Sequence, residues 1–226
     1  AYINSDSVVE NVEKLPWTAV LPKKETWAFS LAKVTDAVWW FYLFWGAIFL
    51  AENHGVKIKE MGLPFLVIYL IADTGSILGG WLSGAFIKTG WSINKARKIT
   101  LLICALIILP VAFVAVTDNK WLAVFLIGLG AAGHQAWSAN IFTLASDVFP
   151  KKATASVVGI GGMVGAVAGI ISNVILGSVL DNAGNTGFFW AFLVAGASYL
   201  IILGLVHLLM PKMTPLDENL NYVYSK

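Results

Sequence analysis

Charged side chains are scarce in this sequence. Asp, Glu, Lys and Arg together make up 12% of its 226 residues, whereas hydrophobic residue types make up 58%. Soluble globular domains carry about 25% charged residues, so the composition does not fit a domain that folds in water. It places the chain in a lipid bilayer, which is the first partner that the sequence predicts.

The sequence has a single cysteine, and the short motifs of enzymes are missing. Cys104 is the single cysteine, which excludes an internal disulfide. The sequence contains no GxxxxGK phosphate loop, no GxSxG nucleophile elbow and no Cys or His pair at metal-ligand spacing. Its three histidines fall in different loops and spans, so a shared metal site is not expected. We therefore predict that the chain is not an enzyme and has no catalytic residues, metal or cofactor.

Long hydrophobic stretches fill most of the chain instead. A helix that crosses a bilayer core needs roughly 20 apolar residues. Stretches of about that length lie at 27–51, 62–87, 99–116, 121–146, 153–180 and 187–210. We predict an all-α membrane protein in which residues 27–210 form a bundle of six transmembrane helices. Residues 1–26 are expected to form a cytoplasmic linker, and residues 211–226 a cytoplasmic tail.

The basic residues are distributed unevenly between the two ends of these spans. With the amino terminus in the cytoplasm, 12 of the 15 Lys and Arg residues lie inside, as the positive-inside rule requires. The inside set is Lys14, Lys23, Lys24, Lys33, Lys88, Lys95, Arg97, Lys98, Lys151, Lys152, Lys212 and Lys226. These cations form no continuous basic face, so no nucleic acid is expected. We predict a multi-pass protein of the cytoplasmic (inner) membrane with both termini of this segment in the cytoplasm.

Asp73 lies about half-way along the second stretch, 62–87. A carboxylate in the bilayer core costs on the order of 2.5–3.5 kcal/mol on insertion scales, so we expect Asp73 to face protein or water rather than lipid. Two interpretations remain open. Asp73 takes up and releases a proton as an ion-coupling residue, or it bonds hydroxyls or backbone of a neighbouring helix.

The first span carries two further charges near its start. Lys33 and Asp36 are one helical turn apart and can pair with each other. Asp36, Trp39 and Tyr42 share one helix face, which combines a charge, aromatic surface and a hydroxyl. We take Trp39 and Tyr42 as substrate-binding candidates. Asp36 is a second possible ion-coupling residue, with a purely structural pairing to Lys33 as the alternative.

The fourth span concentrates hydrogen-bonding side chains. His134, Gln135, Ser138 and Asn140 fall within seven residues. Hydrogen bonds between membrane helices contribute about 0.6 kcal/mol each on average, and this role explains one or two such side chains. A water-lined pocket for a polyhydroxylated ligand, with Trp137 as an aromatic platform, explains the whole cluster.

Glycine spacing marks the fifth span. Gly161, Gly165 and Gly169 follow the GxxxG pattern, which lets two helices approach closely. Asn173 lies further along the same span and could reach either a neighbouring helix or the pocket. In the first span, Trp45 is explained equally well as an anchor at the membrane interface or as a functional side chain.

Several long blocks resemble the carboxyl-terminal half of the hexuronate transporters, in the anion:cation symporter branch of the major facilitator superfamily. The blocks fall within 26–213 and are WAFSLAKVTDAVWWFYLFW, GLPFLVIYLIADTGSILGGWLS, NKARKITLLICALIILPVAF, AGHQAWSANIFTLASDVFPKKATASVVGIGGMVGAVAGI and YLIILGLVHLLMPK. The resemblance implies twelve spans in two six-helix halves around a central cavity that opens alternately to each side. The six spans here correspond to the seventh to twelfth, and the missing amino-terminal six-helix half is an expected partner.

The resemblance also bears on single positions. It places Tyr42 at a tyrosine that lines the cavity in related organic-anion carriers. Three departures accompany it. Ala37 stands where glutamate-type carriers have an arginine, and Gly162 stands where better-known hexuronate and galactonate carriers have a sugar-binding asparagine. The stretch GGWLSGAFIKTGWSINKARK resembles the superfamily's cytoplasmic loop motif, and Ser83 and Gly84 stand where the acid of that motif would fall.

We therefore predict the carboxyl-terminal half of a symporter that moves a sugar acid, most simply a hexuronate such as glucuronate or galacturonate, with a coupling cation, H+. The predicted substrate-binding residues are Trp39, Tyr42, His134, Gln135, Trp137 and Asn140, and the possible ion-coupling residues are Asp73 and Asp36. Two alternatives remain: a transporter of another organic anion, and a membrane structural subunit that does not transport.

Overall fold

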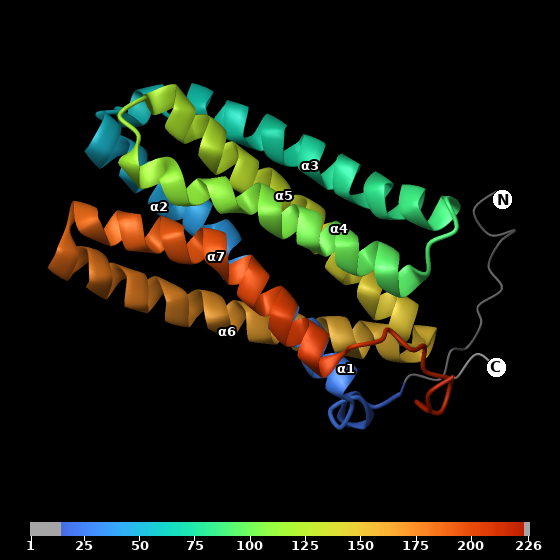
Figure 1. The fold of residues 1–226 in the computed structure, drawn as a ribbon. Helices are drawn as coiled ribbons and strands as arrows, with labels where there is room; N and C mark the ends of the chain where they lie inside the picture. Colours follow the sequence, from blue (N-terminus) through green and yellow to red (C-terminus); the bar gives the residue numbers. More distant parts are fainter. Residues whose placement is uncertain (1–14, 224–226) are drawn as a thin grey trace, which may run out of the picture.

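Long helices make up almost all of the computed structural model, which describes residues 15–223 (Figure 1). The α-helices are α1 (Lys24–Lys33), α2 (Asp36–His54), α3 (Gly62–Lys88), α4 (Ile93–Ile108), α5 (Lys120–Val148), α6 (Lys151–Ala183) and α7 (Asn185–Leu209). Short 3-10 helices are η2 (Trp17–Ala19), η3 (Ile58–Glu60) and η4 (Leu109–Val116). Much of the predicted linker, residues 1–14, and the end of the predicted tail, residues 224–226, lie outside the described residues.

These helices form six membrane-length spans within the described part of the chain. The pair α1 and α2 makes one span, and α4 continues through η4 as another. The spans run over Lys24–His54, Gly62–Lys88, Ile93–Val116, Lys120–Val148, Lys151–Ala183 and Thr186–Leu209. The predicted all-α fold of six transmembrane helices is confirmed. The third span begins six residues earlier than hydropathy indicated, because its first turns carry charged residues that are nevertheless helical.

Local sequence explains where the spans begin and end. The Asn119 side chain caps α5 by accepting hydrogen bonds from the backbone N–H groups of Trp121 and Leu122. Gly55 ends α2 in the left-handed conformation, with φ 64°, which glycine adopts without a steric penalty. Pro110 lies in the first turn of η4, where the third span changes from α-helix to 3-10 helix.

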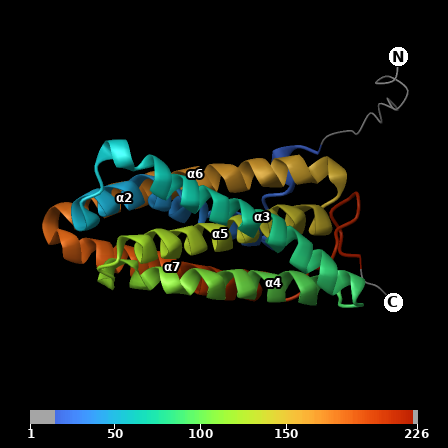
Figure 2. The same ribbon diagram turned by 90° about the horizontal axis from the view of Figure 1, so that it is seen from above.

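Helix α5 lies at the centre of the bundle. Of its most hydrophobic 18-residue window, 67% is buried, compared with 11% for α6. Figure 2 shows α2 and α6 on one side of α5 and α4 and α7 on the other, with α3 crossing α5 diagonally. The long contact between α3 and α5 is made by Gly75 and Gly79, which lie directly against Ala132 and Ala136. Small residues at this contact let the two backbones approach closely.

One end of the bundle gathers most of the charged residues, and we call it the basic end. Helices α1, α4 and α6 begin there and α3, α5 and α7 end there (Figure 1). Its cations in the described chain are Lys23, Lys24, Lys88, Lys95, Arg97, Lys98, Lys151, Lys152 and Lys212. The start of the first span and the end of the last therefore lie at the same end, as an even number of spans requires.

The segment after α7, residues 210–223, folds back across the basic end, and we call it the tail. Its Leu216 N–H donates to the Val148 carbonyl at the end of α5, at 2.8 Å. The Lys98 ammonium of α4 donates to the carbonyls of Met210 and Pro211, at 2.8 and 2.6 Å. Leu216 itself is buried. The tail therefore ties the ends of helices that are distant in sequence.

Replacing Leu216 by alanine is expected to release the tail. Truncating a buried leucine to alanine costs about 2–5 kcal/mol, and the other buried apolar side chains of the tail are Met210, Met213 and Leu220. Trypsin cleavage after Lys212 should then become faster than in the unchanged protein. The matched control is Leu208→Ala, since Leu208 is 74% exposed and loses little on truncation. Equal cleavage rates for the two variants would contradict the assignment.

The tail also contains a carboxylate whose pKa is lowered. The backbone N–H groups of Asn221 and Asn219 each donate to Asp217 Oδ1 at 2.8 Å, which favours the charged form and lowers the pKa of Asp217. A lowered folded-state pKa stabilises the turn above the ordinary Asp pKa, and this contribution disappears as pH falls through the folded-state pKa. We expect acid to loosen the turn, and Asp217→Asn to remove that dependence, as measured by amide hydrogen exchange of residues 213–223 relative to α5.

Candidate functional site

The first span changes its hydrogen-bonding pattern at Val34 and Thr35, which we call the joint. The backbone N–H of Val34 donates to Leu31 at 3.1 Å and that of Thr35 to Ala32 at 3.4 Å, three residues back rather than four. The Thr35 hydroxyl also donates to the Ala32 carbonyl at 2.8 Å. A tightened stretch inside a helix is typical of a hinge. The joint separates α1 from α2 within one membrane span.

An ion pair bridges the joint. Lys33 Nζ lies 2.6 Å from Asp36 Oδ2, so the pairing that the sequence allowed is present. The Lys33 side chain is 8% exposed and that of Asp36 is 29% exposed. The ammonium also lies 4.4 Å from the ring centroid of Phe142 on α5, a distance at which a cation and an aromatic face attract.

Glycines of α6 bring that helix against the joint. A Cβ atom on Gly165 would lie 2.8 Å from the Lys33 carbonyl oxygen, and one on Gly161 would overlap the Phe29 ring. Gly169 has open space around its Cβ position instead. The predicted close helix contact is therefore present at Gly161 and Gly165, and its partner is α1.

Aromatic side chains and a histidine meet beside the joint, and we call this group the aromatic cluster. Trp39 stacks on His134, with ring centroids 5.5 Å apart and planes 19° apart. His134 Nδ1 lies 2.6 Å from the hydroxyl of Tyr199 on α7, and that hydroxyl donates to the Thr35 carbonyl at 3.4 Å. Trp137 packs edge-on against Tyr199 at 5.3 Å. The cluster thus links α2, α5 and α7 directly to the joint.

Tyr42 lies close to this cluster on α2. Its hydroxyl oxygen would be 3.0 Å from a Cβ on Gly130, which is one turn before His134 on α5. The Tyr42 hydroxyl and the Trp137 indole nitrogen are both buried without a hydrogen-bond partner among residues 15–223. Buried polar atoms usually have partners, so these two groups are donors whose hydrogen-bonding capacity is unused within residues 15–223.

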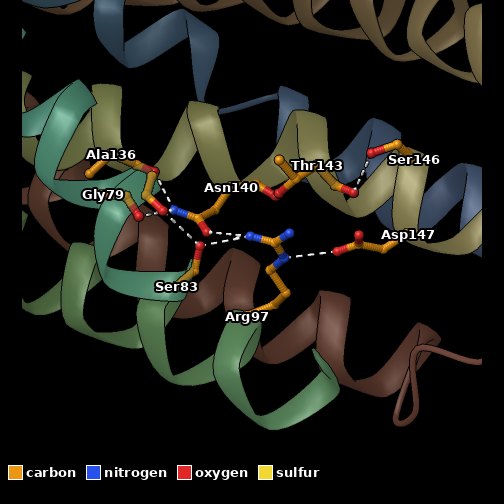
Figure 3. A network of polar contacts seen from close by, with 9 residues as sticks. Gly79, Ser83, Arg97, Ala136, Asn140, Thr143, Ser146 and Asp147 are labelled. Atoms are coloured by element: carbon orange, nitrogen blue, oxygen red, sulfur yellow. Dashed lines mark hydrogen bonds and ion pairs between the residues drawn. The ribbon is translucent and has the colours of Figure 1, made fainter. Parts of the chain in front are cut away.

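Asn140 belongs to a different set of contacts (Figure 3). Its side-chain N–H groups donate to the carbonyls of Gly79 on α3 and Ala136 on α5, both at 2.9 Å. Its oxygen accepts a hydrogen bond from Arg97 of α4 at 3.4 Å. Asn140 therefore connects α3, α4 and α5, and it makes no contact with the aromatic cluster through these bonds.

Arg97 is the centre of that second set. It donates to Asp147 Oδ2 at 2.8 Å and to the Ser83 hydroxyl at 2.7 Å (Figure 3). Ser83 stands where the loop motif usually has an acid. In this chain the acid that pairs with Arg97 is Asp147, at the end of α5. Sequence reasoning singled out neither residue for this role, because both read as ordinary charges beside a loop.

Gln135 and Ser138, two members of the predicted polar cluster, lie on one side of α5. We call it the open side of α5 and define it by Gln135, Ser138 and Phe142. These residues are three and four positions apart and are partly or well exposed, whereas the adjacent His134 and Trp137 are buried. Helix α5 thus divides the predicted cluster. His134 and Trp137 face inward, and Gln135 faces outward together with Ser138.

Asp73 is exposed on α3. It lies on a different side of that helix from Gly75 and Gly79, which pack against α5. Its carboxylate has no hydrogen-bond or ion-pair partner among the residues that the structure describes. Asp73 and Asp36 are therefore on separate helices and in separate surroundings: Asp36 is paired with Lys33, whereas the Asp73 carboxylate has no polar partner among residues 15–223.

Trp45 and Asn173 form a bond that the sequence did not decide. Trp45 Nε1 donates to Asn173 Oδ1 at 2.8 Å, and the Asn173 amide donates to the Gly169 carbonyl at 2.8 Å. Asn173 therefore reaches a neighbouring helix, and this bond ties α2 to α6. Trp45 acts here through its indole N–H.

Replacing Trp45 by phenylalanine is expected to weaken the contact between α2 and α6 by about 1 kcal/mol, since a part-buried side-chain hydrogen bond is lost while most of the aromatic surface remains. The unfolding midpoint of the purified protein in detergent measures the effect. The control is Trp40→Phe, because Trp40 is 46% exposed and stacks on Phe44 instead. A loss in the control as large as in Trp45→Phe would contradict this role.

These features identify the class of protein to which the chain belongs. The chain is a multi-pass membrane protein that keeps charged and hydrogen-bonding side chains between its spans, which is typical of proteins that move solutes. Residues 4–173 match the family model described as Major Facilitator Superfamily. The chain belongs to the Major Facilitator Superfamily, and the family predicted from the resemblance is confirmed.

Curated relatives agree with this assignment. The chain is 26% identical to the hexuronate transporter of Escherichia coli (strain K12) over 183 residues, which are 80% of this chain and 42% of that protein. It is 28% identical over 170 residues to a protein of Bacillus subtilis (strain 168) named "Probable galactarate/D-glucarate transporter GudP", covering 73% of this chain and 37% of that one. It is 24% identical over 212 residues to the D-galactonate transporter of Escherichia coli O6:H1, covering 89% and 49%.

The chain spans less than half of the length of these relatives. It also resembles a solved structure, that of a bacterial homologue of the human lysosomal transporter Spinster in an inward-facing and unoccupied conformation. That likeness has a TM-score of 0.59 at 17% identity and covers 90% of this chain and 50% of that one. The fold is therefore shared with half of that solved chain. All of these relatives are named as transporters and none as an enzyme, which confirms the prediction that the chain is not an enzyme.

Proposed function

We propose that this chain is the carboxyl-terminal half of a symporter that carries a sugar acid, with hexuronates such as glucuronate or galacturonate as the leading substrates and H+ as the coupling cation. Three curated relatives support the substrate class, since their names give hexuronate, galactarate with D-glucarate, and D-galactonate. These compounds share a six-carbon skeleton that bears several hydroxyls and at least one carboxylate. A site for any of them needs hydrogen-bonding groups, aromatic surface and a cation.

The aromatic cluster beside the joint is the observation that carries this proposal. It supplies aromatic surface at Trp39, a hydrogen-bonding histidine, and two buried donors without partners, the Tyr42 hydroxyl and the Trp137 indole N–H. Aromatic faces pack against the C–H surface of a sugar ring, while such donors bind its hydroxyls. Gln135 and Ser138 add polar groups on the adjacent open side of α5.

The role of Asn140 in this proposal is different. It remains a predicted substrate-binding residue, yet its amide is engaged by Gly79, Ala136 and Arg97. A sugar hydroxyl would have to compete with these bonds. We therefore place Asn140 at the edge of the proposed pathway, where it fixes the position of α5 against α3.

Orientation follows from charge. The basic end carries nine of the thirteen Lys and Arg residues of the described chain, and positively charged loops favour the cytoplasm. We place the basic end, with the tail, on the cytoplasmic face of the inner membrane. The side of the bundle that includes α3, α6 and the open side of α5 then faces the missing amino-terminal half, and the substrate passes between the two halves.

Two carboxylates are candidates for coupling to the cation. Asp36 lies beside the aromatic cluster and forms an ion pair with Lys33, whereas Asp73 is exposed on α3. Either can bind a proton on one side of the membrane and release it on the other. Uptake by Asp73→Asn that kept its pH dependence would remove Asp73 from this role, and the same measurement on Asp36→Asn tests the other candidate.

Uptake of radiolabelled D-glucuronate into proteoliposomes tests the proposal. The protein used is the full-length transporter that contains this chain. We expect an inward proton gradient to accelerate uptake, D-galacturonate to compete strongly, D-glucarate and D-galactonate to compete more weakly, and D-glucose not to compete. A membrane structural subunit predicts no uptake at all. Competition by unrelated organic anions, without competition by sugar acids, would show a carrier of another anion.

A further inference from the structure

We infer that Lys33 is the cation with which this half binds the carboxylate of the substrate, and that the substrate gains access to it by displacing Asp36. The inference rests on the proposed function and names a residue of that same site. A ligand that bears a carboxylate needs a cation in its site. The ion pair at the joint supplies it.

Lys33 is the charge within the described spans that is best placed for this role. Arg97 is paired with Asp147 and bonded to Ser83, close to the basic end. Lys98 donates to the carbonyls of Met210 and Pro211 and thereby holds the end of α7. Both of those cations have structural duties at the end of the bundle. Lys33 lies next to the aromatic cluster. The Tyr199 hydroxyl of that cluster donates to the carbonyl of Thr35, which is two residues after Lys33.

The surroundings of the ion pair leave a route to the ammonium. Lys33 is almost fully buried, but the two groups that cover it are not, since Asp36 is 29% exposed and Phe142 is 45% exposed. Phe142 belongs to the open side of α5, together with Gln135 and Ser138. A ligand that moves along that side reaches Phe142 and Asp36 before it reaches the ammonium. The carboxylate of such a ligand can therefore replace that of Asp36.

The exchange balances in charge. Before binding, the ammonium is paired with Asp36. Afterwards it is paired with the substrate carboxylate, the site has gained the substrate's single negative charge, and the released Asp36 carboxylate turns towards the water of the open side. No covalent bond forms or breaks. Because Lys33 and Asp36 flank the joint, the exchange also removes the ion pair that bridges it. Substrate binding then frees α1 and α2 to change their angle at Val34 and Thr35, which is where the hydrogen bonds are already tightened.

A purely structural ion pair makes different predictions, and the double variant Lys33→Gln with Asp36→Asn separates the two. Removing one partner of a buried pair leaves an uncompensated charge, whereas removing both leaves a neutral, hydrogen-bonded pair. The double variant should therefore unfold near the temperature of the unchanged protein. If Lys33 holds the substrate carboxylate, the same variant should bind D-glucuronate at least about 30-fold more weakly, as expected when a buried charge contact is lost.

Calorimetric titration of the purified full-length transporter with D-glucuronate and with its uncharged amide, D-glucuronamide, provides the test. We expect the double variant to lose affinity for the acid and to bind the amide unchanged. Asp36→Asn alone should bind the acid at least threefold more tightly, because the competing carboxylate is gone. Lys33→Arg should retain most of the affinity. Lys152→Gln, which removes a cation at the basic end, is the matched control and should match the unchanged protein.

Three results would overturn the inference. The double variant could bind the acid as well as the unchanged protein, it could lose the acid and the amide equally, or Asp36→Asn could weaken binding of the acid. Absence of binding of any sugar acid by the unchanged protein would overturn the proposed function itself, and the inference with it.

Discussion

Replacing Gly79 by alanine is expected to destabilise the bundle severely, whereas the same change at the adjacent Gly80 is expected to be harmless. A Cβ on Gly79 would overlap the Ala136 side chain and lie 2.5 Å from Ala136 Cα, and it would be 3.0 Å from the Ala136 carbonyl oxygen. These are main-chain or short side-chain atoms that cannot rotate away. Overpacking of this kind costs about 1–3 kcal/mol or more, because α3 and α5 must separate along a long contact.

Gly80 provides the control for this prediction within the same helix turn. Its Cβ position has no atom within 4 Å, so alanine adds no clash and gains helix propensity of up to about 1 kcal/mol. Unfolding midpoints of the two variants in the same detergent should differ in opposite directions from the unchanged protein. If both variants lose stability to the same extent, the close approach of α3 to α5 is not as described.

Removing the charge of Asp147 is expected to be the second large effect. Asp147→Asn leaves the Arg97 guanidinium, which is 12% exposed, with only the neutral partners Ser83 and Asn140. Removing one partner of a buried ion pair costs about 3–5 kcal/mol. Since Asp147 is 21% exposed, solvent screening reduces the expected loss of unfolding free energy to about 2–3 kcal/mol.

A second pair at the same end of the bundle is the control for Asp147. Lys152 and Glu218 lie 3.3 Å apart, and Glu218 is 70% exposed. Exposed pairs contribute about 0–1 kcal/mol, so Glu218→Gln should scarcely change the unfolding midpoint. The loss in Asp147→Asn should also be partly recovered when Arg97 is replaced by methionine. If Glu218→Gln and Asp147→Asn lose equal stability, the ion pair of Arg97 and Asp147 contributes no more to the free energy of unfolding than an exposed pair does.

The six spans could be predicted from the sequence because hydropathy alone determines which segments enter a bilayer. The contact of the fifth span at Gly161 and Gly165 followed from spacing, and the pairing of Lys33 with Asp36 followed from their separation by one turn. Each of these three predictions depends only on residues that are close together in the chain.

The rotation of α5 could not be obtained in the same way. Its hydrogen-bonding side chains fall on several sides of the helix, so no hydrophobic stripe indicates which face is buried. His134, Trp137 and Asn140 were predicted to share one pocket with Gln135. The structure places His134 and Trp137 inward, Gln135 outward and Asn140 against α3 and α4, because α5 is surrounded by other helices on most sides.

Contacts that join distant segments were also beyond the sequence. Tyr199 reads as one more aromatic residue in a hydrophobic span, yet its hydroxyl bonds both His134 and the joint. Asp147 reads as a loop charge, yet it holds Arg97 from a position 50 residues away. The tail reads as a polar terminus, yet Leu216 is buried against the bundle. Such roles depend on which helices are neighbours, which local patterns do not encode.

Labelling of the open side of α5 tests the central claim, that this half forms one wall of a water-filled path for a sugar acid. Cysteine is placed at Gln135 or Ser138 of the full-length transporter, with Cys104 replaced by alanine, and treated with a membrane-impermeant, water-soluble thiol reagent. The control is cysteine at Val194, an exposed position of α7 on another side of the bundle.

We expect that cysteines at 135 and 138 are labelled, that D-glucuronate slows their labelling, and that the cysteine at 194 is not labelled. Cysteines at 135 and 138 that resist the reagent as fully as the one at 194, or that react at the same rate with and without D-glucuronate, would contradict the central claim.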